Sequence, residues 1–238
     1  MTLPPAPQAV LLDLDDTLYA ERSYLIGGIE AVADYLSARV AQSRTELVER
    51  TLQLLAAGRA QLFDRLLATL DLESPAITDA VIHVYRTHRP CLAPFGDVMP
   101  ALQRLRAAGV GLGLVTDGKS VVQHNKISAL GLERWLDVIV CTDDLLEGTA
   151  KPSPRPFAVA LSRLQAAPDR AIYIGDDTAK DFLGPRALGM GTIRLDRKLP
   201  FPLQPHHDFS DKHLAHAICG DLEEAVRCLL SGQNGYAG

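Results

Sequence analysis

The sequence lacks the features that mark secreted, disulfide-stabilised and membrane-spanning proteins. It has 4 cysteines, at Cys91, Cys141, Cys219 and Cys228. None of them lies in a CxxC pair, so we expect reduced, partly buried thiols instead of a disulfide framework or a zinc site. No uncharged apolar run approaches the length of a membrane span, and residues 1–8 lack the basic start and apolar stretch of a secretory signal. We therefore expect a cytoplasmic protein without a membrane partner.

The sequence also lacks a concentrated charge of either sign. Lys and Arg number 24 against 29 Asp and Glu, a formal net charge of -5, and the basic residues are scattered along the chain. Binding to nucleic acid or to an anionic membrane would require a basic patch, so we expect neither partner. The adjacent His206 and His207 have no third ligand at metal spacing, and we expect them in a surface loop.

The length and the hydrophobic patterns predict a large α/β core with an insert. The chain has 238 residues, of which 47% are hydrophobic, so a core plus a smaller unit is expected. From residue 95 onward, helical and strand patterns alternate. The predicted helices cover residues 98–108, 120–130, a segment from Ser153 and Pro154, and 178–188; the predicted strands cover 111–116, 138–141, 171–174 and 192–195, with a last strand and helix within 215–230.

Near-continuous apolar strands such as Val10-Leu11-Leu12 are typical of a parallel sheet that is covered on both faces. We therefore predict a doubly wound, Rossmann-like parallel sheet for residues 1–19 and 94–238. Residues 20–93 show helical patterns alone, over 24–39, 45–57, 59–70 and 76–86, and predict an inserted all-helical domain. Both connections of this insert lie at the carboxyl edge of the sheet, where open α/β folds bind ligands, so we expect it to act as a cap.

The leucines of the insert recur at helical spacing, and we expect them to form its core instead of a ligand surface. These leucines are Leu47, Leu54, Leu55, Leu62, Leu66, Leu67 and Leu70.

Four short strand-like runs each end in residues suited to handling phosphate. Taken alone, each ending is typical of a polar turn, and the order of all four is what carries the information. In chain order the endings are Asp13-Leu14-Asp15-Asp16-Thr17, Thr116-Asp117-Gly118, Lys151-Pro152, and Gly175-Asp176-Asp177 followed by Asp181.

Over residues 10–191 these endings resemble the four signature motifs of the haloacid dehalogenase superfamily. They are most similar to those of its metal-dependent phosphatases, which carry a helical cap between the first two motifs. The resemblance implies hydrolysis of a small phosphorylated metabolite through an aspartyl-phosphate intermediate. A non-enzymatic relative would be expected to have lost a motif acid or Lys151, and none is lost here.

The resemblance assigns roles to the acidic residues. It makes Asp13 the nucleophile and Asp15 the general acid and then the general base. Two carboxylates about 4 Å from a phosphate would each repel it electrostatically by roughly 4 kcal/mol at an effective dielectric constant near 20. The site therefore requires a cation. Mg²⁺ is the expected ion, held by Asp13, Asp176 and the backbone carbonyl of Asp15.

The resemblance also supplies the groups that would bind phosphate and support the metal. Thr116, the Gly118 backbone N–H and Lys151 would contact the phosphate oxygens, with Asp117 beside them. The family commonly has Asn at the position of Asp117, and the role of this acid stays open. The remaining motif residues, Thr17, Asp177 and Asp181, are expected to support the metal site from behind its ligands.

Three other reactions occur in this superfamily. Dehalogenases lack the second acid of the first motif, so Asp15 and Asp16 argue against dehalogenation of a 2-haloacid. Phosphonate cleavage uses a lysine of the cap, and residues 20–93 contain none. Sugar-phosphate mutases share all four motifs, and the mutase reaction stays open as the alternative. The sequence predicts neither the substrate nor the oligomeric state.

Overall fold

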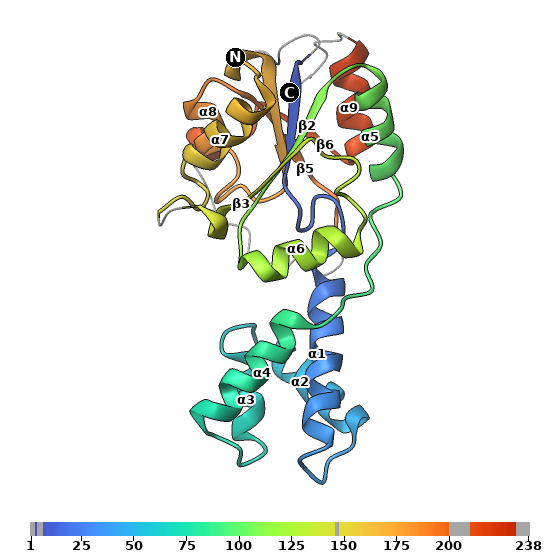
Figure 1. Cartoon of the computed structure of the whole chain (residues 1–238), viewed down its shortest axis with the longest axis vertical. Helices are drawn as coiled ribbons and strands as arrows, with labels where there is room; N and C mark the ends of the chain where they lie inside the picture. The colour runs from blue at the N-terminus through green and yellow to red at the C-terminus, as the bar shows by residue number, and fades with distance from the viewer. Residues whose placement is uncertain (1–2, 4–6, 146–147, 200–209, 232–238) are drawn as a thin grey trace. The chain divides into compact units, whose positions relative to one another are not determined.

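The chain forms two compact units in its computed structural model, which describes residue 3 and residues 7–145, 148–199 and 210–231. One unit comprises Met1–Glu21 with Leu92–Gly238, and the other comprises Arg22–Cys91 (Figure 1). His206 and His207 lie outside the described residues, so their expected loop position stays a prediction. The role of the smaller unit as a cap also stays a prediction.

The described part of the larger unit is built on a parallel sheet of six strands. The strands are β1 (Ala9–Leu12), β2 (Gly111–Thr116), β3 (Val138–Cys141), β4 (Ala171–Gly175), β5 (Gly191–Leu195) and β6 (Ala217–Cys219). Their order across the sheet is β3-β2-β1-β4-β5-β6, and every described pair is parallel. This order confirms the predicted doubly wound, Rossmann-like fold, and it places the end of β1 between the ends of β2 and β4.

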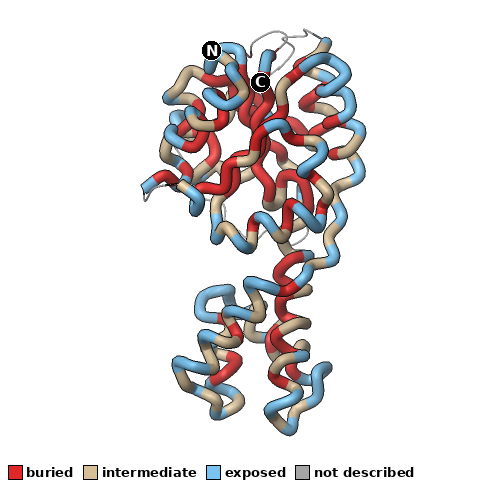
Figure 2. The backbone as a smooth tube through the Cα atoms, in the orientation of Figure 1, coloured by how far each residue is buried: buried red, intermediate tan, exposed pale blue. Residues whose placement is uncertain are grey.

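Helices cover both faces of the sheet. The helices of this unit are α5 (Val98–Ala107), α6 (Ser120–Ala129), α7 (Arg155–Leu164), α8 (Leu183–Ala187) and α9 (Leu222–Ser231), with short 3₁₀ turns η1 (Thr142–Asp144), η2 (Pro168–Arg170) and η3 (Asp211–His213). Helices α7 and α8 lie on one side, α5 and α9 on the other, and α6 lies at the carboxyl edge (Figure 1). Strands β1 and β4 are buried throughout, as their apolar sequences predict (Figure 2).

Helix α8 is shorter than the sequence predicts. The expected helix spanned residues 178–188, whereas α8 begins only at Leu183. The preceding residues form a turn, because the Asp181 carboxylate accepts hydrogen bonds from the backbone N–H groups of Asp176 and Asp177, at 3.1 and 2.9 Å. A short acidic side chain that bonds to nearby backbone in this way competes with helix formation.

The smaller unit consists of four helices, α1 (Glu21–Ser37), α2 (Arg44–Ala56), α3 (Leu62–Ala68) and α4 (Pro75–Thr87). Ser43 and Glu46 form a capping box at the start of α2, and Ser74 caps α4, whose first residue is Pro75. Helix α3 begins at Leu62 instead of residue 59, because Gln61 takes a left-handed backbone conformation with φ 50°.

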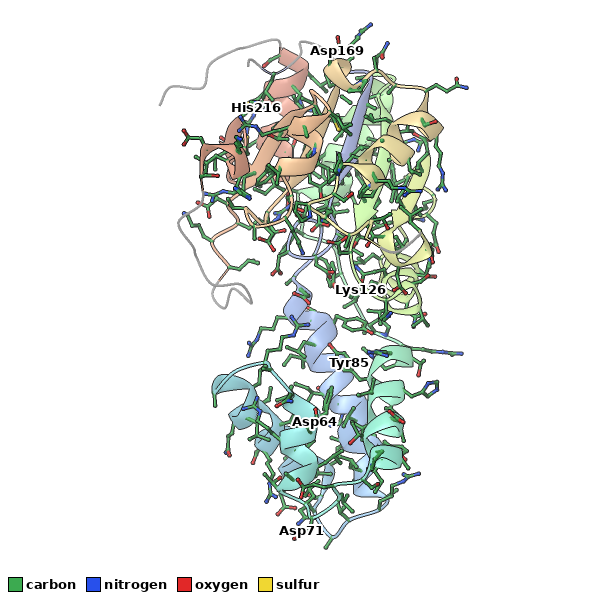
Figure 3. All side chains as sticks on the ribbon, turned by 90° about the vertical axis from the view of Figure 1, so that its left-hand side faces the viewer. Asp64, Asp71, Tyr85, Lys126, Asp169 and His216 are labelled. Atoms are coloured by element: carbon green, nitrogen blue, oxygen red, sulfur yellow. The ribbon has the colours of Figure 1, made fainter. Side chains whose placement is uncertain are left out.

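The predicted leucine core of the smaller unit is largely confirmed. Leu47, Leu66 and Leu67 are buried together with residues of α1 and α4, and Leu54 and Leu70 pack against this cluster. Tyr24 of α1 donates a hydrogen bond to the backbone carbonyl of Tyr85, which ties the two helices together. Figure 3 labels Tyr85 on α4. Among the described residues, no helix combines the length and apolar character needed to cross a bilayer. None of the 4 cysteines, all of which lie among the described residues, forms a disulfide bond.

We predict that Gly175→Ala destabilises the protein. An added Cβ would lie 2.8 Å from Cγ of Asp181, closer than real Cβ contacts, so the Asp181 carboxylate would have to leave its backbone donors. Overpacking of this kind typically costs about 1–3 kcal/mol, and a fall of several degrees in Tm is expected. Gly96→Ala is the matched control, since an added Cβ there meets nothing within 4 Å. Equal melting temperatures for the two variants would contradict the prediction.

Candidate active site

The candidate site lies at the carboxyl edge of the sheet, where β1 and β4 end side by side. Asp13 follows β1 directly, and its backbone N–H continues the ladder by donating to Ile174 of β4 at 2.9 Å. This hydrogen bond fixes the backbone of Asp13, and its side chain is 3% exposed. Burial raises the pKa of Asp13 to about 7, against the opposing effect of Lys151.

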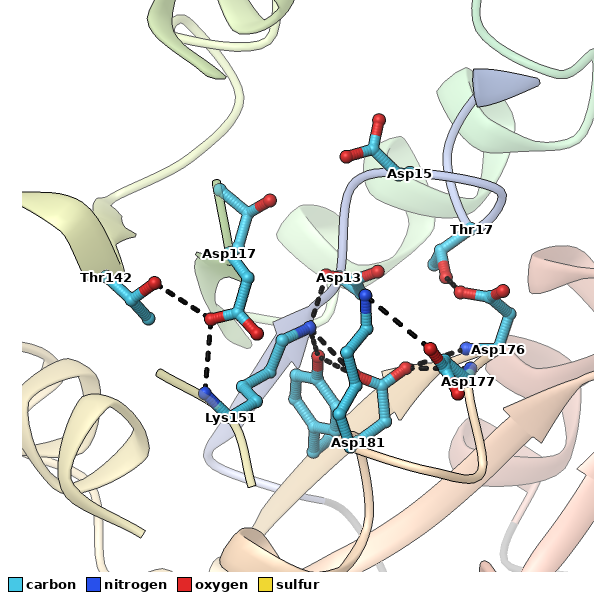
Figure 4. A network of polar contacts seen from close by, with 12 residues as sticks. Asp13, Asp15, Thr17, Asp117, Thr142, Lys151, Asp176, Asp177 and Asp181 are labelled. Carbon is cyan, nitrogen blue, oxygen red and sulfur yellow. Dashed lines mark hydrogen bonds and ion pairs between the residues drawn. The ribbon is translucent and has the colours of Figure 1, made fainter. Parts of the chain in front are cut away.

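Lys151 brings the strand ends together through its ammonium group. Its Nζ donates to Oδ1 of Asp13 at 2.6 Å and to Oδ1 of Asp181 at 2.7 Å, and the side chain is fully buried (Figure 4). Burial disfavours the ammonium, but the two carboxylates outweigh it and raise the pKa of Lys151 well above its usual value. Lys151 lies in the loop between η1 and α7. The expectation that it ends a strand is therefore wrong, because the chain leaves the sheet at Cys141.

Asp181 holds Lys151 and the turn after β4 in place with its two carboxylate oxygens. Oδ1 accepts from Lys151 and from the Tyr173 hydroxyl, which lies 3.1 Å away, and Oδ2 accepts from the backbone of Asp176 and Asp177. Burial disfavours its ionised form, yet Lys151 and these donors lower the pKa of Asp181 below its usual value. Asp181 thus anchors both Lys151 and the turn after β4, and its role behind the metal ligands stays a prediction.

Asp176 completes an acidic cluster that can hold a metal ion. Asp13, Asp176 and Asp181 each offer a carboxylate oxygen within 4.8 Å of the others. Two unit charges at that separation repel by about 3 kcal/mol at an effective dielectric constant near 20. Burial and the neighbouring Asp181 and Asp13 accordingly raise the pKa of Asp176 well above its usual value. Oxygen ligands with excess negative charge suit a hard divalent cation such as Mg²⁺.

Thr17 and Asp177, both expected to support the metal site, lie beside it in different ways. The Thr17 hydroxyl donates to Oδ1 of Asp176 at 3.1 Å and so orients this carboxylate (Figure 4). The Asp177 carboxylate accepts from the backbone N–H of Ala179 at 2.9 Å and lies 3.6 Å from the Lys180 ammonium. Asp177 therefore stabilises its own turn.

The second motif contributes a hydroxyl and a turn. Thr116 ends β2 and is buried, and its hydroxyl accepts a hydrogen bond from the Gln123 amide at 2.6 Å, which leaves the hydroxyl proton available for another acceptor. The Asp117 carboxylate instead accepts from the Thr142 hydroxyl and the Lys151 backbone, at 2.8 and 3.1 Å (Figure 4). Asp117 thus fixes the Lys151 loop. Contact of its side chain with phosphate stays a prediction.

Asp15 follows Asp13 by two residues but has a separate set of partners. Its carboxylate accepts from Lys126 at 2.8 and 2.9 Å, from the Gln123 amide at 3.1 Å and from the Tyr19 hydroxyl. Burial alone would raise its pKa, but Lys126 and the other donors together lower it below the usual value. Figure 4 shows the Asp15 side chain directed away from the Lys151 ammonium.

Sequence reasoning missed four side chains that shape this site, namely Tyr19, Gln123, Lys126 and Tyr173. A tyrosine within the apolar strand β4 was a weak signal, because its hydroxyl needs a partner once it is buried. Gln123 and Lys126 lie three residues apart on α6, directly after the second motif, and a shared helix face was the available signal for them.

Comparison with known proteins places this site in a known family. Residues 10–195 match the family model of the haloacid dehalogenase-like hydrolases. The chain is 32% identical to the glyceraldehyde 3-phosphate phosphatase of Methanopyrus kandleri over 84% of this chain and 89% of that protein. It is 28% identical to the ribulose-1,5-bisphosphate 5-phosphatase of Halopiger xanaduensis, over 79% of this chain and 84% of the relative.

Solved structures agree with this placement. A haloacid dehalogenase-type phosphatase from Thermococcus onnurineus superposes with a TM-score of 0.62 at 27% identity, covering 95% of this chain and 99% of the other. A 2-haloacid dehalogenase from Pseudomonas syringae pv. Tomato gives a TM-score of 0.65 at 24% identity over 94% and 99% of the two chains, and that likeness carries the fold alone. The predicted family is thereby confirmed: the chain belongs to the haloacid dehalogenase-like hydrolases.

Proposed function

We propose that this protein is a Mg²⁺-dependent phosphatase that hydrolyses a small phosphomonoester through an aspartyl-phosphate intermediate. The observation that carries this proposal is the buried Lys151 ammonium, held between Asp13 and Asp181 beside the Asp176 carboxylate. When all three carboxyl groups are ionised, their charge exceeds that of the Lys151 and Lys180 ammonium groups, and a divalent cation would balance the excess so that a phosphate dianion could enter. The phosphatase names of the relatives support the same reaction class.

The first step of the proposed mechanism is attack by Asp13. Its carboxylate oxygen forms a bond to phosphorus, and the bond from phosphorus to the substrate alcohol breaks. Asp15, which must enter this step protonated although its donors lower its pKa, gives its proton to the leaving alcohol oxygen. The Thr116 hydroxyl and the Gly118 backbone N–H donate to the phosphoryl oxygens, and Lys151 offsets the charge of the transferring group. The product of this step is an acyl phosphate on Asp13.

In the second step, water attacks the phosphorus of this acyl phosphate. Asp15, now ionised, takes a proton from the water, inorganic phosphate leaves, and the Asp13 carboxylate is restored. Asp13, Asp176 and the Asp15 backbone carbonyl are the groups proposed to hold Mg²⁺. The ion would neutralise negative charge at the pocket and keep Asp13 ionised, which matters because the pKa of Asp13 is about 7 without it.

Relatives guide the choice of substrates to test. They are named for glyceraldehyde 3-phosphate, ribulose 1,5-bisphosphate and phosphoglycolate. Glyceraldehyde 3-phosphate recurs in the names of several relatives and is therefore our first candidate substrate. A dehalogenase function is disfavoured because Asp15 is present and is held by donors at the site.

We expect purified protein to release inorganic phosphate from p-nitrophenyl phosphate and from glyceraldehyde 3-phosphate in the presence of Mg²⁺. Removal of the metal with EDTA should abolish the release, and added Mg²⁺ should restore it, because the acidic cluster would otherwise repel the dianion. Phosphate release is the diagnostic measurement, since a sugar-phosphate mutase would move the phosphoryl group without net release. A protein that is inert toward both esters and a wider metabolite panel would refute the proposal.

We also expect Asp13→Asn to lower kcat by roughly three orders of magnitude or more, because an amide is not a nucleophile. The side-chain volume stays nearly unchanged. The Tm should stay close to that of the wild type, since the amide oxygen can still accept from Lys151 and the Asp181 carboxylate still balances the charge of the ammonium. Asp169→Asn is the matched control, an exposed acid in η2 before β4 (Figure 3). Mass spectrometry of acid-quenched wild type should detect a phosphorylated chain, and substantial turnover by Asp13→Asn would contradict covalent catalysis.

A further inference from the structure

Helix α6 directs two buried polar side chains toward the loop that follows β1. Gln123 is 1% exposed and Lys126 is 4% exposed, although lysine is among the residues least often buried. The two lie three residues apart and therefore on one face of the helix. A lysine so deeply buried needs an anionic partner to offset its desolvation.

The anionic partner of Lys126 is Asp15. The ammonium reaches both carboxylate oxygens, at 2.8 and 2.9 Å, and the exposed fractions of the two side chains are 5% and 18%. The contact joins residues 111 positions apart in the chain. It is thus a tertiary connection from the first motif to Lys126 of α6, whose position Figure 3 labels.

Gln123 links the same carboxylate to the phosphate-binding end of β2. Its Nε2 lies 3.1 Å from Oδ2 of Asp15 and 2.6 Å from the Thr116 hydroxyl, so one amide touches both groups. Gln123 also packs against Gly118: an added Cβ there would lie 3.2 Å from Cδ of Gln123. Tyr19 donates to Oδ1 of Asp15 from a third direction.

We propose that Lys126 is a positioning residue which, with Gln123, fixes the Asp15 carboxylate relative to Thr116 and the bound phosphate. This inference rests on the proposed function, in which Asp15 protonates the leaving alcohol. A general acid must lie within hydrogen-bond reach of the leaving oxygen, and small misplacements of such a group are costly. Lys126 acts through Asp15 and is not itself assigned to the substrate.

The leaving group provides the sharpest test. p-Nitrophenolate departs without protonation, whereas the alkoxide of glyceraldehyde 3-phosphate requires a proton from Asp15. The ratio kcat/KM includes the steps up to departure of the alcohol. Lys126→Met should therefore lower kcat/KM for glyceraldehyde 3-phosphate by roughly 10²-fold or more, and for p-nitrophenyl phosphate by less than about 5-fold.

Two further variants separate positioning from other roles. Lys126→Arg keeps the charge and should recover part of the lost activity toward the alkyl ester. Lys212→Met removes an exposed lysine of η3 and should leave kcat/KM for both esters unchanged. Equal losses for both esters, or a loss confined to a higher KM, would overturn the inference, because these results indicate general disruption or direct substrate binding.

A thermal double-mutant cycle tests the pairing without any activity. Lys126→Met should lower the Tm less when Asp15→Asn is already present, because a neutral amide does not need the ammonium. If the wild type is inert toward both esters, the proposed function fails while this cycle still decides whether Lys126 holds Asp15. Additive effects of the two substitutions on Tm would refute the positioning role.

Discussion

The site depends on one buried ion cluster, in which the Lys151 ammonium bridges Asp13 and Asp181. All three side chains are at most 3% exposed, so none is stabilised by bulk water. Removing one partner of a buried pair typically costs about 3–5 kcal/mol, because the remaining charge is left uncompensated. The cluster therefore links three separate segments, the end of β1, the Lys151 loop and the turn after β4, into one arrangement that is stable only as a whole.

The acidic residues of this site differ in pKa and orientation because their ionic and hydrogen-bond partners differ. The Asp13 pKa is raised to about 7 by burial, whereas the Asp181 pKa lies below its usual value because Lys151 and backbone donors outweigh burial. The Asp117 carboxylate is directed to Thr142 and the Lys151 backbone. Environments that push the pKa values of neighbouring carboxyl groups apart are how a single site can hold a nucleophile, an acid and structural anions together.

The sequence predicted the elements of this site that follow from strand order. Apolar runs that end in Asp13, Thr116 and Asp176 must converge if the sheet is parallel, and the structure has that order. The sequence did not predict the features of the site that depend on tertiary contacts. The start of α8 is delayed by the Asp181 carboxylate, and Lys126 carries no local sign that a residue 111 positions away is its partner. Hydrophobic periodicity does not reveal polar pairs of this kind.

The contacts of α6 give a physical reason why only a short turn separates the end of β2 from the start of α6. Thr116 ends β2, Gly118 turns the chain with φ 127°, and α6 begins at Ser120, so Gln123 and Lys126 return to the same edge of the sheet. A side chain at Gly118 would press on Gln123, which holds both Asp15 and Thr116. The glycine thus has a structural role besides the proposed donation of its backbone N–H to phosphate. It leaves the space in which α6 can connect the proposed general acid to the proposed phosphate-binding hydroxyl.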